Sequence, residues 1–548
     1  MSVAAESGVT APTRRGWFAL AVLSVGLGMI VLDGTIVGVA LPDIIKDLHL
    51  DLTDAQWVNS LYAVLLAALL LSTGKLADRW GRRLLFLVGL VVFVGGSILA
   101  GMSDAAGPLI GARAVQAVGA ALIMPSTLST VNAVFRGRYR AAAFGVWGAV
   151  ISGAAAVGPL AGGALTQWGS WHWIFWVNVP LGALVFIAGI LVVPETRGAK
   201  GRPGADVDGA LLSAIGFGAL VFAVIEGPDL GWWKPQGAFK LLGWTWPMDA
   251  AISVVPIAMA VAVTALTLFV FWERHREKVR RSALLDLNLF TLPTFSWGNL
   301  TAAMVAVGEF AIIFVLPLYL VNALGLDVMG AGLVLAAMAI GAFFSGAAAR
   351  HVAARFGSPG TVLIGLGLEV IGVVALAFLV SATTPGWLIA IPLVVYGLGL
   401  GLASAQLTGT VLRDVPVEVS GQGSATQSTV RQIGSALGTA FAGGTLSVAL
   451  ALTLPAALNA AGLTGDAADE LAAATRQSAG TTITQLRAGG DAGSFGDQGA
   501  AAADALAAGF ADATRWSLLV ASVFLLLGLV GAARLRRAAT AEDADITA

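Results

Sequence analysis

Long apolar runs constrain this chain of 548 residues more than any other feature of its sequence. A helix needs about 20 apolar residues to cross the hydrocarbon core of a bilayer. Fourteen stretches meet this requirement and predict an all-α membrane protein. They cover residues 17–42, 54–73, 84–102, 107–130, 141–165, 173–193, 208–226, 249–272, 293–320, 328–349, 360–381, 386–411, 426–453 and 514–535.

The composition agrees with this class and excludes several kinds of site. Charged residues make up 11% of the chain, against about a quarter in soluble domains. The chain has no cysteine, which excludes disulfides, cysteine-bound zinc and iron–sulfur clusters. Its four histidines are scattered, and it lacks a phosphate-binding loop of the G-x-x-x-x-G-K-[ST] type. We therefore expect no metal, no cofactor, no nucleic-acid partner and no direct use of ATP.

The basic residues fall mainly on one side of the predicted membrane. If the N-terminus is cytoplasmic, 23 of the 31 lysines and arginines lie in cytoplasmic segments, six lie outside, and two lie within helices. This distribution follows the positive-inside rule. Arginine outnumbers lysine, as is typical of GC-rich bacterial genomes. We expect a multi-pass protein of a bacterial inner (plasma) membrane, with both termini in the cytoplasm and membrane lipids as neighbours.

Two short similarities predict an internal duplication. The loop sequence GKLADRWG (74–81) is similar to RHVAARFG (350–357). Asp33 and Glu309 each lie about halfway along an apolar helix, eight or nine residues before a proline. The duplication divides the 14 helices into six, two and six. Transporters built from repeats bind their substrate near the midplane, between the repeated halves.

The predicted organisation follows from this division. It consists of a cytoplasmic N-terminus (1–16), a six-helix bundle (17–193), a segment with two inserted helices (194–292, helices at about 208–226 and 249–272), helices 9–13 of the C-terminal bundle (293–453), a low-complexity extracytoplasmic loop (454–513), helix 14 (514–537) and a cytoplasmic tail (538–548). The part of the loop at 455–512 is rich in Ala, Gly, Thr and Asp, so we expect it to be disordered with short helices such as 466–477. The basic segment 272–282 is expected to anchor a helix at the inner leaflet.

Four segments resemble the major facilitator superfamily, and in particular its 14-helix drug:proton antiporter branch. They are LDGTIVGVALP (32–42), GKLADRWGRR (74–83), GAAAVGPLAGG (153–163) and WHWIFWVNVPLG (171–182). Two positions depart from the pattern. Ala117 stands where helix 4 usually has glycine, and His172 stands where arginine is usual. The resemblance implies the major facilitator fold and proton-driven export of drugs.

Asp33 is the sharpest candidate for a functional residue. A carboxylate at the middle of a bilayer is costly unless it is paired, solvated or protonated, so Asp33 could exchange a proton as its surroundings change. The alternative is a structural acid that is hydrogen-bonded to a neighbouring helix. The repeat position of Glu309 suggests that it faces the same cavity as Asp33, from the other half. Arg113 in helix 4 needs an acidic, carbonyl or aqueous partner, and the resemblance assigns it to proton coupling.

Two further acids and two motifs are also candidates for a structural or functional role. We expect a structural or partly solvated role for Glu369, and contact with water for Glu226. The resemblance implies a conformational latch in the loop 74–83, with Asp78 bonding to the other half in the outward-facing state; Arg82 and Arg83 could equally anchor the topology. The latch residues are Gly74, Asp78, Arg79, Gly81, Arg82 and Arg83, and the antiporter motif of helix 5 comprises Gly158, Pro159, Gly162 and Gly163.

Aromatic side chains on the same helices could contact flat lipophilic cations by stacking and cation–π attraction. The candidates are Trp57, Tyr62, Trp147, Phe310 and Phe314. Together the sequence predicts a monomeric, proton-coupled secondary exporter of lipophilic, often cationic drugs. Export of an endogenous lipid, siderophore or metabolite is the close alternative. A membrane enzyme or a channel lacks a supporting motif.

Overall fold

The structure is a computed structural model that describes residues 13–135, 138–197, 206–241, 244–416, 419–489 and 498–547. Almost all of these residues are helical. The helices are α1 (Arg14–Asp47), α2 (Leu52–Trp80), α3 (Arg82–Gly101), α4 (Ala106–Val134), α5 (Arg138–Trp168), α6 (Trp173–Trp176), α7 (Asn178–Val192), α8 (Val207–Leu230), α9 (Val254–Lys278), α10 (Pro293–Leu318), α11 (Val328–Phe356), α12 (Ser358–Leu379), α13 (Gly386–Val411), α14 (Ser420–Ala460), α15 (Asp466–Gln477), α16 (Thr481–Arg487) and α17 (Gly499–Thr547). Short turns η1 (Leu287–Thr291) and η2 (Tyr319–Ala323) flank α10, and strands β1 (Lys240–Leu241) and β2 (Trp244–Thr245) form a hairpin between α8 and α9.

Most of the long helices can cross a membrane. Within the described residues, twelve spans are long and apolar enough, and α6 and α7 together form one of them. Helix α2 adds a thirteenth if its two parts, which meet at 50°, are counted as one span. Helix α5, with 31 residues, packs along α1 and α11. The structure thus confirms the all-helical membrane class, whereas the predicted number of fourteen spans is not confirmed exactly.

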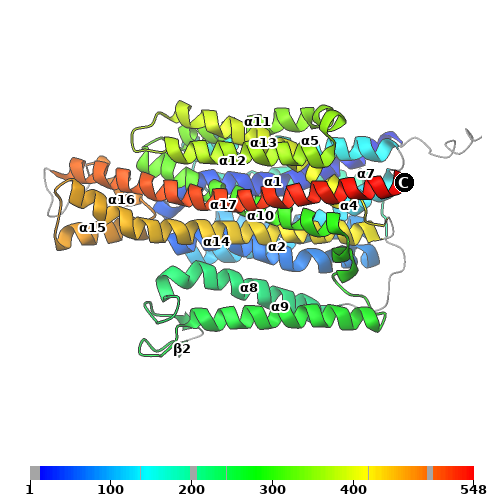
Figure 1. The fold of residues 1–548 in the computed structure, drawn as a ribbon, viewed down its shortest axis with the longest axis horizontal. Coiled ribbons are helices and arrows are strands. Elements are labelled where there is room, and N and C mark those ends of the chain that lie inside the picture. The colour runs from blue at the N-terminus through cyan, green and yellow to red at the C-terminus, as the bar shows by residue number, and fades with distance from the viewer. Residues whose placement is uncertain are drawn as a thin grey trace, which may run out of the picture.

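The long helices form two bundles with a separate helix pair at their side (Figure 1). In the first bundle α1 packs on α5, and α4 packs on both α2 and α3. In the second bundle α10 packs on α14 and α17, and α13 packs on α11 and α12. Helices α8 and α9 pack on each other, and α8 contacts α2 of the first bundle and α14 of the second. The inserted pair therefore lies against the seam between the two halves.

Equivalent residues of the two halves recur at a constant separation of 276 residues. Asp51 caps α2 by accepting a hydrogen bond from the amide of Asp54, and Asp327 caps α11 in the same way through Gly330. Gly81 and Gly357 have φ angles of 126° and 74°, which favour glycine at both helix junctions. The pair Asp33 and Glu309 has the same separation. Helix caps and turns thus support the duplication that the short sequence similarities predicted.

Glycines allow the third and fourth helices of each half to approach closely. A Cβ atom on Gly119 of α4 would lie 2.4 Å from the backbone nitrogen of Phe93 in α3. A Cβ atom on Gly399 of α13 would lie 2.6 Å from the backbone nitrogen of Glu369 in α12. Close approach through small residues is the usual way in which helices pack in lipid, where the hydrophobic effect does not drive helices together.

The two ends of the molecule are packed differently. We call the end that carries the α2–α3 and α4–α5 junctions the basic end, and the other the opposite end. Towards the opposite end a single apolar core joins both halves, from Ile36 of α1 to Phe314 of α10 and Leu446 of α14. Towards the basic end each half has a core of its own, around Phe86 in the first half and Phe295 in the second. The halves are thus joined mainly away from the basic end.

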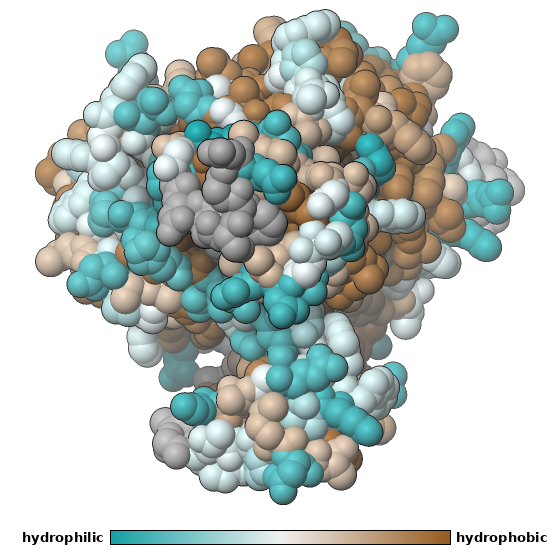
Figure 2. Space-filling view, turned by 90° about the vertical axis from the view of Figure 1, so that its left-hand side faces the viewer, coloured by the Kyte–Doolittle hydropathy of each residue, from teal (hydrophilic) through white to brown (hydrophobic). Residues whose placement is uncertain are grey.

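The predicted loop 454–513 is more ordered than expected. Helix α14 continues to Ala460, α17 begins at Gly499, and α15 occupies the predicted range 466–477. The amide of Asn322 donates to the carbonyl oxygen of Ala479 at 2.9 Å, and Arg487 donates to the carbonyl oxygen of Ala323 at 2.9 Å. The expectation of disorder is wrong for the described residues, because buried alanines pack these short helices; residues 490–497 lie outside the described part. Figure 2 shows the opposite end of the molecule, where α15 and α16 lie. Polar residues cover much of this end, whereas apolar residues cover a flank of the bundle.

The glycine contact between α3 and α4 predicts a stability difference between two alanine variants. Gly119→Ala places a methyl group against the backbone of α3, so we expect a loss of about 1–3 kcal/mol, typical of overpacking. Gly111→Ala on the same helix meets nothing within 4 Å and should be neutral or slightly stabilising. Thermal unfolding of both purified variants in detergent measures the difference. Equal melting temperatures would contradict the close approach of the two helices.

Candidate functional site

A closed polar cluster lies inside the first bundle. It comprises Asp33 on α1, Ser97 on α3, Arg113 and Gln116 on α4, and Asn178 at the start of α7. Each of the five residues is at most 1% exposed. The close contact of α3 with α4 contributes to this arrangement, because the position of Gly96 has no room for a Cβ beside the backbone of Gln116. Four helices therefore bring their polar side chains to one point.

The carboxylate of Asp33 is fully engaged in this cluster. Its Oδ2 atom forms an ion pair with the guanidinium of Arg113. Its Oδ1 atom accepts hydrogen bonds from Nε2 of Gln116 at 3.0 Å and from Nδ2 of Asn178 at 3.1 Å. The same two amide groups also donate to Oγ of Ser97, at 2.8 and 3.2 Å. Within the described residues, all these partners of Asp33 come from its own half of the molecule.

Arg113 has further partners that hold its charge in place. Its Nη1 donates to Oε1 of Gln116 at 2.9 Å, and its Nε donates to the carbonyl oxygen of Val58 at 3.3 Å. The ring of Tyr62 lies 4.3 Å below the guanidinium and contributes a cation–π contact. A buried ion pair is tolerated only when additional hydrogen bonds satisfy both partners. The cluster meets this condition and carries no net charge while Asp33 is ionised.

The second half arranges its acids differently. Glu309 on α10 pairs with Arg431 on α14, with 3.3 Å between Oε2 and Nη2. The side chain of Glu309 is 12% exposed and that of Arg431 is 50% exposed, so this pair is far more open than the pair in the first half. The prediction that Glu309 faces the same cavity as Asp33 from the other half stays untested. The structure adds Arg431, which the sequence placed only at a helix edge, as the ionic partner of Glu309.

Two other predicted acids lie in unexpected surroundings. Glu369 on α12 is completely buried, so of the two expected roles the partly solvated one is wrong and the structural one remains. Glu226 near the end of α8 accepts a hydrogen bond from the indole nitrogen of Trp57 at 2.8 Å. Trp57 is therefore directed towards the inserted helices, where it also contacts Phe222. The structure thus adds a contact of Trp57 with the insert, while the prediction that Trp57 is a cavity aromatic stays untested.

The remaining aromatic candidates divide between cores and surfaces. Tyr62 belongs to the polar cluster through Arg113. Phe314 is 1% exposed and lies in the core that joins the two halves, while Phe310 is half-buried. The side chain of Trp147 lies outside the described residues. Among the aromatic candidates whose side chains the structure describes, only Tyr62 thus touches a charged group of the candidate site.

The Asp78, Gly81, Arg82 and Arg83 positions of the loop 74–83 contact residues of the first half. Asp78 bonds to Arg82 one helical turn later, with 2.8 Å between the closest atoms, and Arg82 also donates to the carbonyl oxygen of Ser129. The backbone amide of Arg83 donates to Glu195 at 3.2 Å, and a Cβ on Gly81 would clash with the same carboxylate. Gly74 packs against Pro125, and Arg79 is exposed. Within the part of the chain that the structure describes, the bond of Asp78 to the other half, which was expected for an outward-facing state, is not formed in this conformation.

A lysine of this loop contacts the connection between α9 and α10. Nζ of Lys75 donates to Oγ of Ser282 at 2.9 Å and to the carbonyl oxygen of Ala283. Gln422 of the second half donates to the same carbonyl at 3.4 Å.

Arg276 belongs to the basic segment 272–282, which was expected to anchor a helix at the inner leaflet. It is 5% exposed and pairs with Asp206 at 3.3 Å. Contrary to that expectation, this residue does not reach the lipid headgroups.

The glycines of the helix-5 motif lie at two helix crossings. A Cβ on Gly158 would overlap the side chain of Thr35 in α1, and one on Gly162 would lie 3.0 Å from the carbonyl oxygen of Ile36. A Cβ on Gly163 would lie 3.1 Å from the Cα of Met329 in α11, across the seam between the halves. The carbonyl oxygen of Pro159 approaches Gly332 of α11 in the same way. The motif therefore packs α5 on its own half and on the other half at once.

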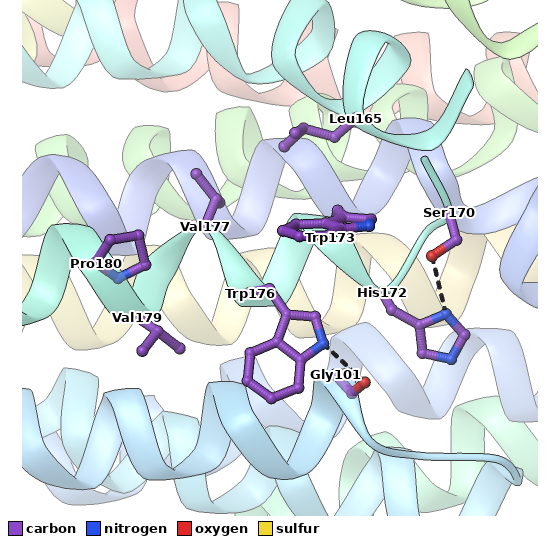
Figure 3. A pocket seen from close by; sticks show the side chains of 9 residues that line it. All are labelled: Gly101, Leu165, Ser170, His172, Trp173, Trp176, Val177, Val179 and Pro180. Atoms are coloured by element: carbon purple, nitrogen blue, oxygen red, sulfur yellow. Dashed lines mark hydrogen bonds between the residues drawn. The ribbon is translucent and has the colours of Figure 1, made fainter. Parts of the chain in front are cut away.

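A hollow of about 700 Å³ lies at the opposite end of the first bundle (Figure 3). The indole nitrogen of Trp176 donates to the carbonyl oxygen of Gly101 at 3.1 Å, and Oγ of Ser170 lies 3.3 Å from Nδ1 of His172. Figure 3 shows both pairs at the wall of the hollow, with Trp173 alongside. All lining residues belong to the first half, so this hollow is separate from the seam between the halves.

Comparison with known proteins identifies the family. The sequence model of the Major Facilitator Superfamily matches residues 23–439. The chain belongs to the Major Facilitator Superfamily. The multidrug resistance protein Stp of Mycobacterium tuberculosis (strain CDC 1551 / Oshkosh) is 33% identical over 79% of this chain and 77% of its own length. The riboflavin transporter RibZ of Clostridioides difficile (strain 630) is 29% identical over 78% of this chain and 88% of its own length.

A solved structure agrees with the superfamily fold. It is the crystal structure of a bacterial homolog to the human lysosomal transporter Spinster, in an inward-facing and unoccupied conformation. It aligns with a TM-score of 0.63 and 17% sequence identity, over 96% of this chain and 99% of that one. The fold expected from the four sequence motifs is thereby confirmed, and this chain is a multi-pass transporter of the superfamily.

Sequence reasoning missed several members of the polar cluster. Ser97 carried no signal, because a serine in an apolar helix usually bonds to its own backbone, as Ser97 also does. Asn178 lay inside the segment 171–182 that supported the superfamily resemblance, and Gln116 lay three residues after Arg113 in helix 4, yet nothing in the sequence assigned either residue to Asp33. A search for amides on neighbouring helices at the depth of the acid could have found both.

The ion pair predicts how stability responds to its removal. Arg113→Gln leaves a buried carboxylate without its cation, and breaking such pairs costs about 3–5 kcal/mol. The double variant Asp33→Asn/Arg113→Gln removes both charges and should lose less than Arg113→Gln alone. Thermal unfolding in detergent measures both, with the exposed Arg14→Gln as a control that should match the original protein. Additive losses in the double variant would argue against the pairing.

Proposed function

We propose that the chain is a proton-coupled exporter of lipophilic, often cationic drugs that works by alternating access. The observation that carries the proposal is the buried Asp33–Arg113 pair, which is surrounded by amide donors at the middle of α1. Intramembrane ionisable residues are expensive, and in transporters they mark proton and substrate pathways. The similarity to a multidrug resistance protein supports drugs as the substrate class.

Protonation of Asp33 would change the charge of a closed site. A proton taken from water by the carboxylate cancels its negative charge and leaves the cation of Arg113 uncompensated. Arg113 then keeps only Gln116, the carbonyl oxygen of Val58 and the ring of Tyr62 as partners. The surplus positive charge disfavours a cationic substrate nearby and favours a rearrangement that rehydrates the cluster. Release of the proton restores the neutral pair, so proton and cationic drug exclude each other.

The packing of the two halves supports a cycle of alternating access. The shared core towards the opposite end and the separate cores towards the basic end fit a conformation in which access lies at the basic end. The basic loops lie at that end, so the positive-inside rule supports a cytoplasmic position for it. Helices α5 and α11 cross the seam through Gly163 and Met329 and would have to separate when access changes sides. The driving force is the proton gradient rather than a bound cofactor.

Export of an endogenous metabolite is the second candidate. It is favoured by the similarity to a riboflavin transporter, whose substrate is a flat, uncharged metabolite. A neutral site such as the intact Asp33–Arg113 pair does not by itself select a cation. Competition between a cationic dye and neutral planar compounds for transport separates the two substrate classes.

The first test measures the transport of a cationic dye into everted membrane vesicles that maintain a pH gradient. We expect the original protein to move a cationic dye against its gradient, and to stop when the pH gradient is collapsed. Asp33→Asn should reach the membrane, because asparagine keeps an oxygen acceptor for Arg113, but it should lose proton-coupled transport. Asp469→Asn, an exposed acid of α15, serves as the control with unchanged transport. Full dye transport by Asp33→Asn at neutral pH would falsify the role of this acid.

The second test joins the two halves by an engineered disulfide. The chain has no native cysteine that could form other disulfides. A Cβ on Gly38 of α1 would lie 3.1 Å from Cγ2 of Ile313 in α10, close enough for a disulfide between Gly38→Cys and Ile313→Cys. Oxidation should stop transport and a reductant should restore it. The control pair Gly28→Cys/Val150→Cys has a similar 3.2 Å contact within one half and should transport when oxidised. Transport by the oxidised Gly38–Ile313 pair would exclude separation of the halves at this point.

A further inference from the structure

Asn178 carries an oxygen atom that the closed polar cluster leaves without a partner. The side chain is 1% exposed, and its Nδ2 atom donates to Asp33 at 3.1 Å and to Ser97 at 3.2 Å. Within the described residues, its Oδ1 atom accepts no hydrogen bond. Buried polar atoms are nearly always hydrogen-bonded, so this oxygen requires an explanation. In the conformation described, the amide of Asn178 uses only its donor end.

The groups bonded to Asp33 suit its ionised form and not its protonated form. Oδ2 faces the guanidinium of Arg113, which has donors only, and Oδ1 faces Nε2 of Gln116 and Nδ2 of Asn178. Within the part of the chain that the structure describes, every hydrogen-bond partner of the carboxylate is thus a donor. A protonated carboxyl group is itself a donor and needs an acceptor. A proton on Asp33 therefore has no acceptor until a neighbour rearranges.

The acceptors of two other cluster residues are already in use. Oε1 of Gln116 accepts from Nη1 of Arg113 at 2.9 Å, so rotation of this amide would turn its NH₂ group towards the guanidinium. Oγ of Ser97 accepts from Gln116 and Asn178 at 2.8 and 3.2 Å. It also donates to the carbonyl oxygen of Phe93 at 2.9 Å, so its two lone pairs and its proton are all engaged. Among the side chains bonded to Asp33 or to these amides, Oδ1 of Asn178 is the acceptor that stays free in the described structure.

A rotation of the Asn178 amide brings this oxygen to Asp33. The oxygen and nitrogen atoms exchange places when the terminal torsion turns by half a revolution, and this torsion is soft in asparagine. The backbone can stay in place, because a Cβ on Gly182 one turn later would lie 2.3 Å from Cγ2 of Val94, which shows how closely α7 packs on α3. While Asp33 is ionised, the rotation is disfavoured because Oδ1 would face a carboxylate oxygen. The orientation of the amide thus depends on the charge of Asp33.

Few ionisable groups can change the charge next to Asn178. Arg113 of α4 and Tyr62 of α2 lie at the cluster, and an arginine does not lose its proton in proteins. Helices α6 and α7 carry no ionisable residue. On α10, Glu309 pairs with Arg431. The remaining ionisable residues of the helices packed on α1 or α7 lie in the first or last two turns of their helices. Protonation of Asp33 is therefore the event to which this amide responds.

We propose that Asn178 is a positioning residue for proton coupling, whose amide turns to accept a hydrogen bond from protonated Asp33. This proposal rests on the proposed role of Asp33 and adds the residue that responds to its protonation. Water at the accessible side supplies the proton, which forms an O–H bond at Oδ1 of Asp33, and no other covalent bond forms or breaks. Oδ1 of Asn178 then accepts from this O–H group, while its Nδ2 leaves Asp33 and Ser97.

The rotation changes which helices the amide connects. Ser97 of α3 keeps the hydrogen bond from Gln116 but loses the one from Asn178. Asn178 remains bonded to Asp33 of α1, now as the acceptor. Protonation thus removes a hydrogen bond between α7 and α3 at the depth of the acid, and release of the proton restores it.

Infrared difference spectroscopy of the purified protein between neutral and acidic pH tests the new hydrogen bond. The original protein should show the C=O stretch of protonated Asp33, a band that Asp33→Asn removes. In Asn178→Ala the band should move to higher frequency, because the O–H group loses its acceptor. Asn299→Ala is the matched control, since Asn299 is 2% exposed but bonds to Phe295 on its own helix, and it should leave the band in place. Absence of the band in the original protein, or an unshifted band in Asn178→Ala, overturns the proposal.

A second measurement avoids any variant at position 178 that could fold poorly. Asparagine labelled with the heavy carbon isotope in its side-chain amide separates these C=O bands from the rest of the protein. On acidification the band of Asn178 should move to lower frequency, because its Oδ1 gains a hydrogen bond. The same shift should be missing in Asp33→Asn. Labelled bands that do not respond to acidification would contradict the rotation.

Transport in proteoliposomes then separates positioning from substrate binding. We expect Asn178→Ala to keep the KM for a cationic dye, because Asp33 retains Arg113 and Gln116, and to lose about 2- to 10-fold in maximal rate, as for the loss of one hydrogen bond. An unchanged maximal rate overturns the positioning role. If the original protein moves dye without proton counterflow, the proposed function fails, and the infrared comparison still decides whether Asn178 responds to Asp33. Proton counterflow with an unshifted band rejects the role of Asn178 alone.

Discussion

The need to compensate every buried charge governs the centre of this protein. A bilayer offers no water to Asp33 or Arg113, so each must find its partners among neighbouring helices. The ion pair alone does not satisfy the lone pairs and donors of both groups, and Gln116, Asn178 and Ser97 supply the remaining hydrogen bonds. Four helices must therefore meet at one depth and with fixed rotations. The position of one acid thus determines much of the architecture of the first half.

Small residues make this meeting of helices sterically possible. A Cβ on Gly96 would lie 2.7 Å from the backbone nitrogen of Gln116, so α3 can approach α4 there only because this position is a glycine. That approach brings Ser97 within 2.8 Å of the amide of Gln116. In lipid, such close packing replaces much of the stabilisation that a soluble protein obtains from hydrophobic burial. The hydrogen bonds of the polar cluster and the positions of the glycines are consequently two aspects of one constraint.

The sequence predicted features that depend on one helix at a time. Hydrophobic length located the spans, and the duplication followed from residues with fixed spacing, such as Asp33 and Glu309. The sequence could not predict which face of one helix meets which face of another, because several rotations bury an apolar helix equally well. The contacts of Trp57 with Glu226 and of Arg431 with Glu309 depend on such rotations. Helix α15 was predicted at 466–477, but the packing of α15 and α16 into an ordered segment was missed for a similar reason, since alanine-rich helices pack through contacts that composition does not show.

The duplicated scaffold carries unequal chemistry in its two halves. The site of Asp33 is closed and charge-balanced, so a proton can reach it only after the cluster opens. The pair of Glu309 and Arg431 is half exposed on the arginine side, so water can reach it in the conformation described. Two identical, closed ion pairs would give a proton no point of entry, whereas two open ones would lose the desolvation that makes an intramembrane acid sensitive to conformation. A fold of two similar halves therefore gains from unequal sites, because the ion pair of one half is accessible to water while the ion pair of the other half stays buried.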